Sequence, residues 1–241
     1  SGMPFKGFPV QISGPRPPGT NPSRVHKTVE LAVTAALATA YRVLPRDELL
    51  EEIQHGDPLT RPAALASGGG RLKTEDLPLL LSLTGDDSPA IAQAAVISLR
   101  HYGEPAAVKK LKELAHRNQP PLSTTAFDSL AASRYPASHE TLLKMLGDSD
   151  PKARKDIVAT MARYPRPAFA DAIHGYATNA DPELSLAALQ ALARIGHPGL
   201  MDVLKDALKG THPPRRNAAL SILASRPDQD SQRLAIEHVL K

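Results

Sequence analysis

The sequence of 241 residues contains no cysteine and no tryptophan, and it has only four phenylalanines and five tyrosines. The absence of cysteine excludes a disulfide framework, a thiol nucleophile and a thiolate metal site. It fits a reducing cytoplasm, which is the favoured location, and it also allows a bacterial periplasm. Ser1-Gly2-Met3 resembles a cleavage scar followed by a start codon, so a signal peptide could have preceded the natural chain.

Two further absences bear on membrane and nucleic-acid binding. No apolar run approaches the ~20 residues that span a bilayer, so the sequence predicts a soluble chain without a membrane span. Residues 1–29 contain four basic side chains and no acidic one, and the whole chain has a formal net charge of +4. Residues 30–241 therefore carry equal numbers of acidic and basic side chains. This balance argues against nucleic acid as a partner, since phosphate binding favours an excess of lysine and arginine.

The most informative feature that is present is a repeat of 31 residues. Prolines recur at this interval, at Pro58, Pro89, Pro120, Pro151, Pro182 and Pro213. A small or branched apolar residue stands six positions after each of them, at Ala64, Ala95, Ala126, Ile157, Ala188 and Ala219. Other apolar residues follow seven, ten and 22 positions after the prolines, and this spacing predicts one apolar stripe on each helix. An earlier copy without its proline holds Val33, Leu37, Leu49 and Ile53.

The clearest copy begins at Asp181 and ends at Leu208. Asp181 is a predicted N-cap, Pro182 suits the first helical position, and Gly196-His197-Pro198 separates a first helix from a second. Such a pair of helices cannot bury its apolar face alone and must stack on its neighbours. The sequence therefore predicts an all-α fold, an α-solenoid of about seven 31-residue helical hairpins over residues 24–241.

This copy also carries a resemblance to a known family. Its Asp-Pro pair, Ala-Ala-Leu core and Ile-Gly-His-Pro break resemble the short HEAT-like repeats first described in bilin lyases, and the resemblance covers roughly residues 24–241. It implies a HEAT-like superhelix. It implies no single activity, because similar repeats serve as scaffolds, lyase subunits and metal enzymes.

Two segments depart from the repeat. Residues 1–23 contain six prolines and four glycines, which predicts an extended N-terminal arm. We expect this arm to dock on its own solenoid or on a neighbouring copy, so an arm-mediated dimer is one option and the oligomeric state stays open. In the second copy, Pro62 and the glycines predict a short helix at 62–66 and a flexible loop up to Leu72. This loop is either a binding element or a plain insertion, and its candidate residues are Gly68, Gly69, Gly70 and Arg71.

The resemblance also implies that the second helix of each pair lines the concave face. Position 20 after the prolines faces away from the core of that helix, and it holds Lys109, Glu140, Asp171, Asp202 and Arg233. Lys112 and His174 lie three residues further on the same helical faces as Lys109 and Asp171. We expect this stripe to contact an extended partner with basic residues at its centre, and the alternative is an ordinary solvated surface. Neighbouring acids would lie ~10 Å apart, too far to share a metal ion.

Three functions remain open at this point. The leading hypothesis is a non-enzymatic scaffold or adaptor that holds another protein or a peptide on its concave face. The second is an enzyme or enzyme subunit of the bilin lyase type, which rests on the resemblance alone. The third is binding of a nucleic-acid backbone through the basic arm, and the neutral body argues against it. The sequence offers no catalytic constellation, no metal-ligand set and no cofactor site.

Overall fold

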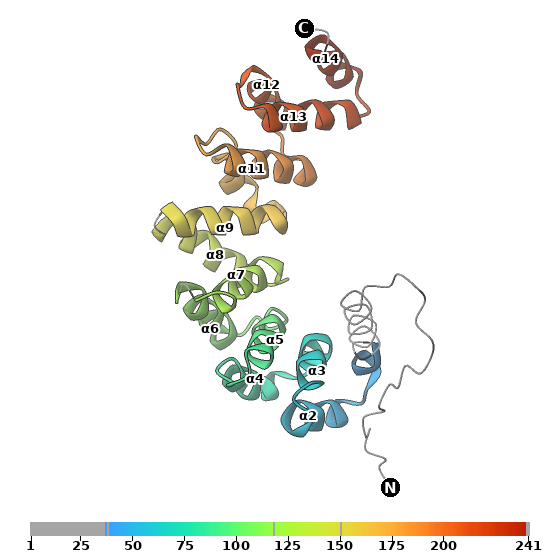
Figure 1. Ribbon diagram of the computed structural model, residues 1–241, viewed down its shortest axis with the longest axis vertical. Helices are drawn as coiled ribbons and strands as arrows, with labels where there is room; N and C mark the ends of the chain where they lie inside the picture. Colours follow the sequence, from blue (N-terminus) through green and yellow to red (C-terminus); the bar gives the residue numbers. More distant parts are fainter. Residues whose placement is uncertain (1–36, 38, 118, 150, 240–241) are drawn as a thin grey trace, which may run out of the picture.

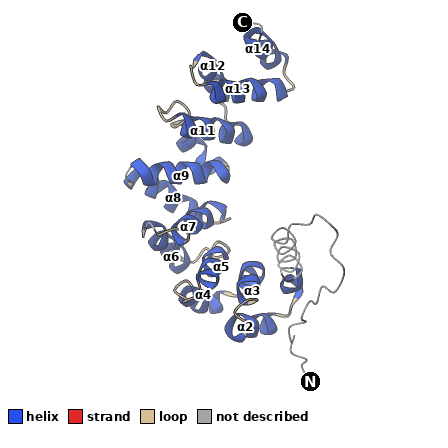
Figure 2. Cartoon of the chain, in the orientation of Figure 1, coloured by secondary structure: helices blue, strands red, loops and turns tan. Residues whose placement is uncertain are grey.

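The structure is a computed structural model that describes residues 37, 39–117, 119–149 and 151–239. The predicted arm, residues 1–23, and residues 24–36 and 38 of the predicted array lie outside the described residues, so the expectation that the arm docks is not addressed. Within the described residues, all regular secondary structure is helical (Figure 2). No helix in this part is long and apolar enough to cross a membrane.

Two sets of helices alternate along the chain. The first set consists of α3 (Arg61–Gly68), α5 (Pro89–Leu99), α7 (Leu122–Ala132), α9 (Pro151–Arg163), α11 (Pro182–Ile195) and α13 (Pro213–Ser225). The second set consists of α2 (Arg46–His55), α4 (Leu77–Leu83), α6 (Pro105–His116), α8 (Pro136–Asp148), α10 (Ala170–His174), α12 (Leu200–Lys209) and α14 (Gln229–Val239). Short 3-10 turns at Gly69–Arg71, Thr74–Asp76 and Pro167–Phe169 join some of them. This arrangement confirms the predicted all-α solenoid.

The predicted register of the repeat is confirmed. We call the six prolines that recur every 31 residues the register prolines. Four of them are the first residues of their helices, where the missing N–H costs nothing. The six residues that stand six positions after the prolines are all fully buried. At the start of α11, the Asp181 carboxylate accepts hydrogen bonds from the backbone N–H groups of Glu183 and Leu184, at 3.0 and 3.2 Å. At its end, Gly196 adopts a left-handed conformation with φ of 75°, as a helix C-cap requires.

The helices form an arc, and the two sets lie on opposite sides of it. Figure 1 shows α3, α5, α7 and α13 nearer the hollow of the arc, α4, α6, α8 and α12 on the outer side, and α9 and α11 running across the array. We call the first set the inner helices and the second set the outer helices. The prediction that the second helix of each pair lines the concave face is therefore wrong.

The sizes of the buried side chains explain the direction of the curvature. Neighbouring inner helices pack directly against one another, from α3 on α5 through to α11 on α13. Many of their buried residues are small, for example the run Ala92, Ala94 and Ala95 with Ser98 in α5. The outer helices bury larger residues such as Leu77, Leu80 and Leu83 in α4. Because small residues permit a shorter distance between helix axes, the layer that contains them lies on the inside of the arc.

The predicted flexible loop at Gly68–Arg71 is also wrong. Gly68 is the last residue of α3 and Gly69–Arg71 is a 3-10 turn, and both Gly68 and Gly69 are buried. A Cβ on Gly68 would lie 2.5 Å from a methyl carbon of Leu49, and a Cβ on Gly69 would overlap the Ser98 side chain. The Tyr102 hydroxyl donates hydrogen bonds to the carbonyl oxygens of Gly69 and Leu72, at 2.7 and 3.1 Å. Close packing therefore outweighs the poor helix propensity of glycine here.

Candidate functional site

The residues of the predicted stripe are exposed and lie on the outer helices. Each of α6, α8, α10, α12 and α14 contributes one or two of them: Lys109, Lys112, Glu140, Asp171, His174, Asp202 and Arg233. They follow successive repeats, as the spacing predicts. However, Figure 1 shows α6, α8 and α12 on the outer side of the arc, so Lys109, Lys112, Glu140 and Asp202 do not line the concave face.

One part of the stripe makes a contact that the sequence reading missed. Asp171 and His174 lie on the same helical face, but Asp171 Oδ1 lies 3.5 Å from Nε2 of His197. The His174 ring stacks on the His197 ring, with centroids 4.8 Å apart. Nδ1 of His197 accepts the backbone N–H of Gly199 at 3.0 Å, so neutral His197 carries its proton on Nε2. Among the described residues, no group of three or more His, Cys, Asp or Glu side chains is placed to hold a metal ion.

The inner helices present a different surface to the hollow of the arc. Positions four and eight after the register prolines are exposed or partly exposed on these helices. Most of the side chains there are small or uncharged: Pro62, Ala66, Gln93, Ile97, Thr124, Ala159, Leu186, Gln190, Asn217 and Ser221. Lys155 and Asp128 are the charged members of the set. The centre of the concave face is therefore a surface of low charge that follows the whole arc.

The two helical layers differ in charge, although the sum over residues 30–241 is zero. The inner helices contain eight basic and three acidic residues within their described bounds. The outer helices contain eight basic and twelve acidic residues. A neutral total thus conceals a basic inner layer and an acidic outer layer.

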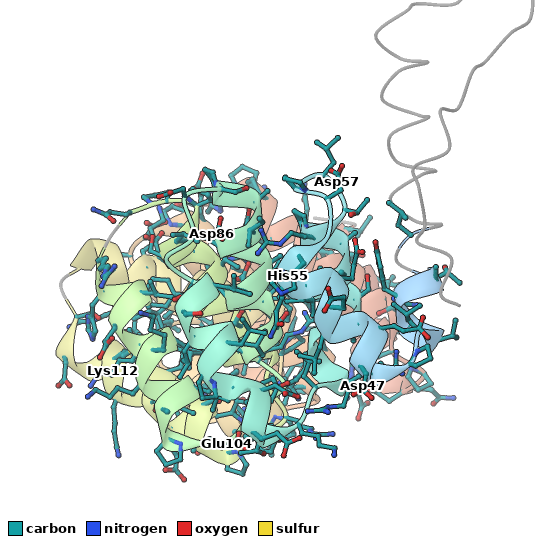
Figure 3. All side chains as sticks on the ribbon, turned by 90° about the horizontal axis from the view of Figure 1, so that it is seen from below. Asp47, His55, Asp57, Asp86, Glu104 and Lys112 are labelled. Atoms are coloured by element: carbon teal, nitrogen blue, oxygen red, sulfur yellow. The ribbon has the colours of Figure 1, made fainter. Side chains whose placement is uncertain are left out.

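Further arginines follow the carboxyl ends of the inner helices. Figure 3 shows the turns before α3 and α5, at Asp57 and Asp86, on one edge of the array, and Glu104, which follows α5, on the opposite edge. The inner helices therefore end on the edge of Glu104. Seven arginines lie at or just beyond these helix ends, and two of them, Arg163 and Arg226, pair with Asp128 and Asp228. We define the arginine edge as the other five: Arg71, Arg100, Arg134, Arg166 and Arg194.

Hydrogen bonds to the preceding repeat hold three of these guanidinium groups. Arg166 donates to the carbonyl oxygens of Ala131 and Ala132 at the end of α7, at 2.8 and 2.7 Å. Arg194 donates in the same way to Ala162 of α9, and Arg71 donates to the Tyr41 carbonyl oxygen. These bonds satisfy carbonyl groups that a helix end leaves without partners.

The other two arginines lie beside His101, and both affect the pKa of its ring. Arg100 Nε donates to Nε2 of His101 at 3.2 Å, and the Arg134 guanidinium lies over the Tyr135 ring, 5.1 Å from its centroid. Burial lowers the pKa of His101, and the positive charges of Arg100 and Arg134 lower it further. Both guanidinium groups are therefore close enough to His101 for their positive charges to lower the pKa of its ring.

A family model described as HEAT repeats matches residues 46–131 and 139–224, which together make up well over half of the chain. The chain belongs to the HEAT repeat family. This match confirms the resemblance noted in the Ile-Gly-His-Pro copy. It supports a repeat scaffold of a kind that generally mediates protein interactions, and it assigns no catalytic activity.

Other comparisons add little to the HEAT repeat assignment. A comparison with curated proteins returned no match. Among solved structures, the crystal structure of an engineered protein aligns with 18% sequence identity over 92% of this chain and 69% of that chain. Its TM-score of 0.37 is too low to support any conclusion about function.

The HEAT array contains a hollow at one end of the arginine edge. It has a volume of about 470 Å³ and lies between the carboxyl-terminal halves of α11 and α13. Its lining combines aliphatic and polar side chains: Gln190, Ala193, Arg194, Leu200, Ile222, Ser225 and Arg226. The hollow can therefore accept an apolar side chain beside an acidic group.

The sequence reading missed the arginine edge for an identifiable reason. Its members stand 11 to 15 positions after the register prolines, so they do not share one position of the repeat. The signal that could have revealed them is an arginine close to the end of each first helix. The alternation of the two layers then brings these helix ends to one edge.

Proposed function

We propose that the protein is a non-enzymatic scaffold that binds another protein along the concave face of its HEAT repeats. The observation that carries this proposal is the continuous surface of small and uncharged side chains on the inner helices. A surface of this kind lets a partner approach the helices closely and costs little desolvation of charge. Its length offers many weak contacts in series, which is how solenoids use their concave surfaces.

Contacts between neighbouring inner helices hold this surface in place. Gln93 of α5 donates a hydrogen bond to the Thr125 hydroxyl of α7, at 3.1 Å. Arg163 of α9 forms an ion pair with Asp128 of α7, at 3.0 Å. Such bonds fix side chains before a partner arrives, which lowers the entropy cost of binding. A preorganised concave face therefore favours a docking platform.

The proposal is tested by photo-crosslinking from both faces of the arc. The photoreactive residue p-benzoylphenylalanine replaces Thr124 or Ser221 on the inner helices, which are exposed. Matched controls carry it at Lys112 or Asp202 on the outer helices, which are also exposed. Irradiation in cells of the source organism should give protein adducts from the inner positions and none from the outer ones.

Two results would contradict the proposal. Adducts from Lys112 and Asp202 alone would place binding on the convex face and revive the predicted stripe and its partner with basic residues. No adducts from any position, together with turnover of a small molecule by the purified chain, would support an enzyme of the lyase type instead.

A further inference from the structure

We propose that the arginine edge binds an extended acidic segment of the partner protein. This inference rests on the proposed scaffold function and names the chemistry of the segment that is bound. The arginines of the chain differ in whether they have a carboxylate partner. Arg46 forms ion pairs with Glu75 and Asp76, both at 2.7 Å. None of the five arginines of the edge has a carboxylate partner among the described residues.

Hydrogen bonds position the edge arginines without neutralising them. A guanidinium group has five N–H donors, and Arg166 uses two of its nitrogen atoms on carbonyl oxygens of α7. The bonds to helix ends account for the orientation of Arg71, Arg166 and Arg194, but a carbonyl oxygen carries no net charge. The remaining donors can bind a carboxylate through charge-assisted hydrogen bonds. Structural capping and ligand binding are therefore compatible roles for the same side chains.

The repeat distance predicts the spacing of acids in the ligand. Neighbouring packed helices lie ~8–10 Å apart, and the edge contributes about one arginine per repeat. A segment in the polyproline II conformation rises ~3.1 Å per residue with three residues per turn, so three residues span about one repeat and every third side chain lies on the same face. A segment with an acidic residue at every third position would thus place one carboxylate near each successive arginine.

The hollow between α11 and α13 distinguishes a protein segment from nucleic acid. Arg194 and Arg226 line it together with Leu200 and Ile222, and none of its lining residues is aromatic. Arg226 pairs with Asp228 at 2.9 Å, so Arg194 is the arginine of the hollow that has no carboxylate partner among the described residues. Sites for single-stranded nucleic acid usually place bases on aromatic rings. An aliphatic lining beside arginines instead suits a leucine-like side chain that follows an acidic residue. We therefore assign an acidic peptide with one apolar anchor to this surface.

The test measures binding of defined probes to the full purified chain by fluorescence anisotropy. The first probe is an unstructured peptide with glutamate at every third position and one leucine. The second has lysine in place of each glutamate, and the third is a single-stranded oligonucleotide. The glutamate peptide should bind at least tenfold more tightly than either of the other two probes at physiological salt. Tighter binding of the oligonucleotide, or equal binding of the two peptides, would overturn the assignment.

Variants then locate the site. The edge variant is Arg100→Gln with Arg134→Gln, which leaves the bonds to the preceding helix ends intact. The control is Lys109→Gln with Lys112→Gln on outer helix α6, which removes the same charge from the opposite layer. The edge variant should weaken binding of the glutamate peptide about tenfold or more, and the control less than about threefold. An equal loss of affinity in the two variants would mean that only the net charge of the protein matters, and it would reject the arginine edge as the binding site.

This experiment separates the inference from the function on which it rests. Thermal unfolding followed by circular dichroism verifies that both double variants stay folded. If the inner positions still yield crosslinked partners while the glutamate peptide fails to bind, the scaffold stands and the acidic ligand is wrong. If the inner positions yield no adducts either, the scaffold itself is wrong.

Discussion

The inner and outer helices have the same apolar periodicity but different roles. Both layers contribute fully buried residues to one continuous core, such as Leu189 in α11 and Leu204 in α12. The layers differ in the size of the buried side chains and in the sign of the charge on their helices. Periodicity therefore decides that a segment is an amphipathic helix, whereas side-chain size decides on which side of the arc it lies.

The comparison also changes how the charge of the chain is understood. The equal numbers of acidic and basic side chains in residues 30–241 argue against a nucleic-acid partner. The alternating layers nevertheless sort the charges, and they bring the ends of the inner helices to one edge. Net charge is thus a weak guide to the surface of a solenoid, because the fold separates side chains that are neighbours in sequence.

The prediction with the largest expected change in the free energy of unfolding tests whether the two layers share one core. Leu189→Ala in inner helix α11 should lower the free energy of unfolding by ~2–5 kcal/mol, through lost burial and the cavity that remains. Leu204→Ala in outer helix α12 should give a loss in the same range, because Leu204 is equally buried. Chemical denaturation measures both. The exposed Ile236 provides the control, since Ile236→Ala should change stability by less than ~0.5 kcal/mol. A loss below ~1 kcal/mol for Leu189→Ala would contradict the register of the repeat.

The second prediction tests whether small residues hold the inner layer close. Gly69→Ala would place a methyl group against the Ser98 side chain and should cost ~1–3 kcal/mol. Gly147 in outer helix α8 is the matched position, because a Cβ there would meet no atom within 4 Å. Gly147→Ala should stabilise the protein by up to ~1 kcal/mol through helix propensity. If both changes stabilised the chain equally, the glycine run would be a loop after all.

The smallest effect concerns the turn that joins inner helix α13 to outer helix α14. Hydrogen bonds from Ser231, with help from Arg226, lower the pKa of Asp228 to about 2. Because the pKa is depressed on folding, Asp228 contributes stability above the unfolded value of ~3.9 and loses it as the pH falls toward 2. Asp228→Asn should therefore lower the unfolding midpoint at pH 6. The difference from the unchanged chain should disappear near pH 2, and a difference independent of pH would contradict the assignment.

Most of the fold could be predicted because the repeat specifies it many times. Each register proline and each alanine six positions later repeats the same information, so an error in one copy is corrected by the others. The first helix of the clearest copy, expected between the Asp181 N-cap and Gly196, agrees with α11 (Pro182–Ile195). The loop predicted at Gly68–Arg71 is wrong because the prediction used the low helix propensity of glycine and ignored the helices packed against it. Only the packed structure reveals that Leu49 and Ser98 leave no room for a side chain there.

The candidate surface was harder to predict than the fold. The stripe of Glu140, Asp171 and Asp202 follows from spacing alone, and its presence on successive outer helices could be foreseen. Which face of the arc carries the stripe could not be predicted from spacing, because the curvature depends on the distances between helices in both layers. The alanines of the first helices hold that information, because small buried side chains permit a shorter distance between helix axes.

The contacts of the array also determine how it unfolds. The substantial contacts join helices that are one or two steps apart along the chain, for example α5 with α4, α6 and α7. A protein built in this way resembles a one-dimensional array in which each unit is coupled only to its neighbours. Weakening a central pair such as α7 and α8 would therefore divide one cooperative transition into two, and the blocks on either side could melt independently.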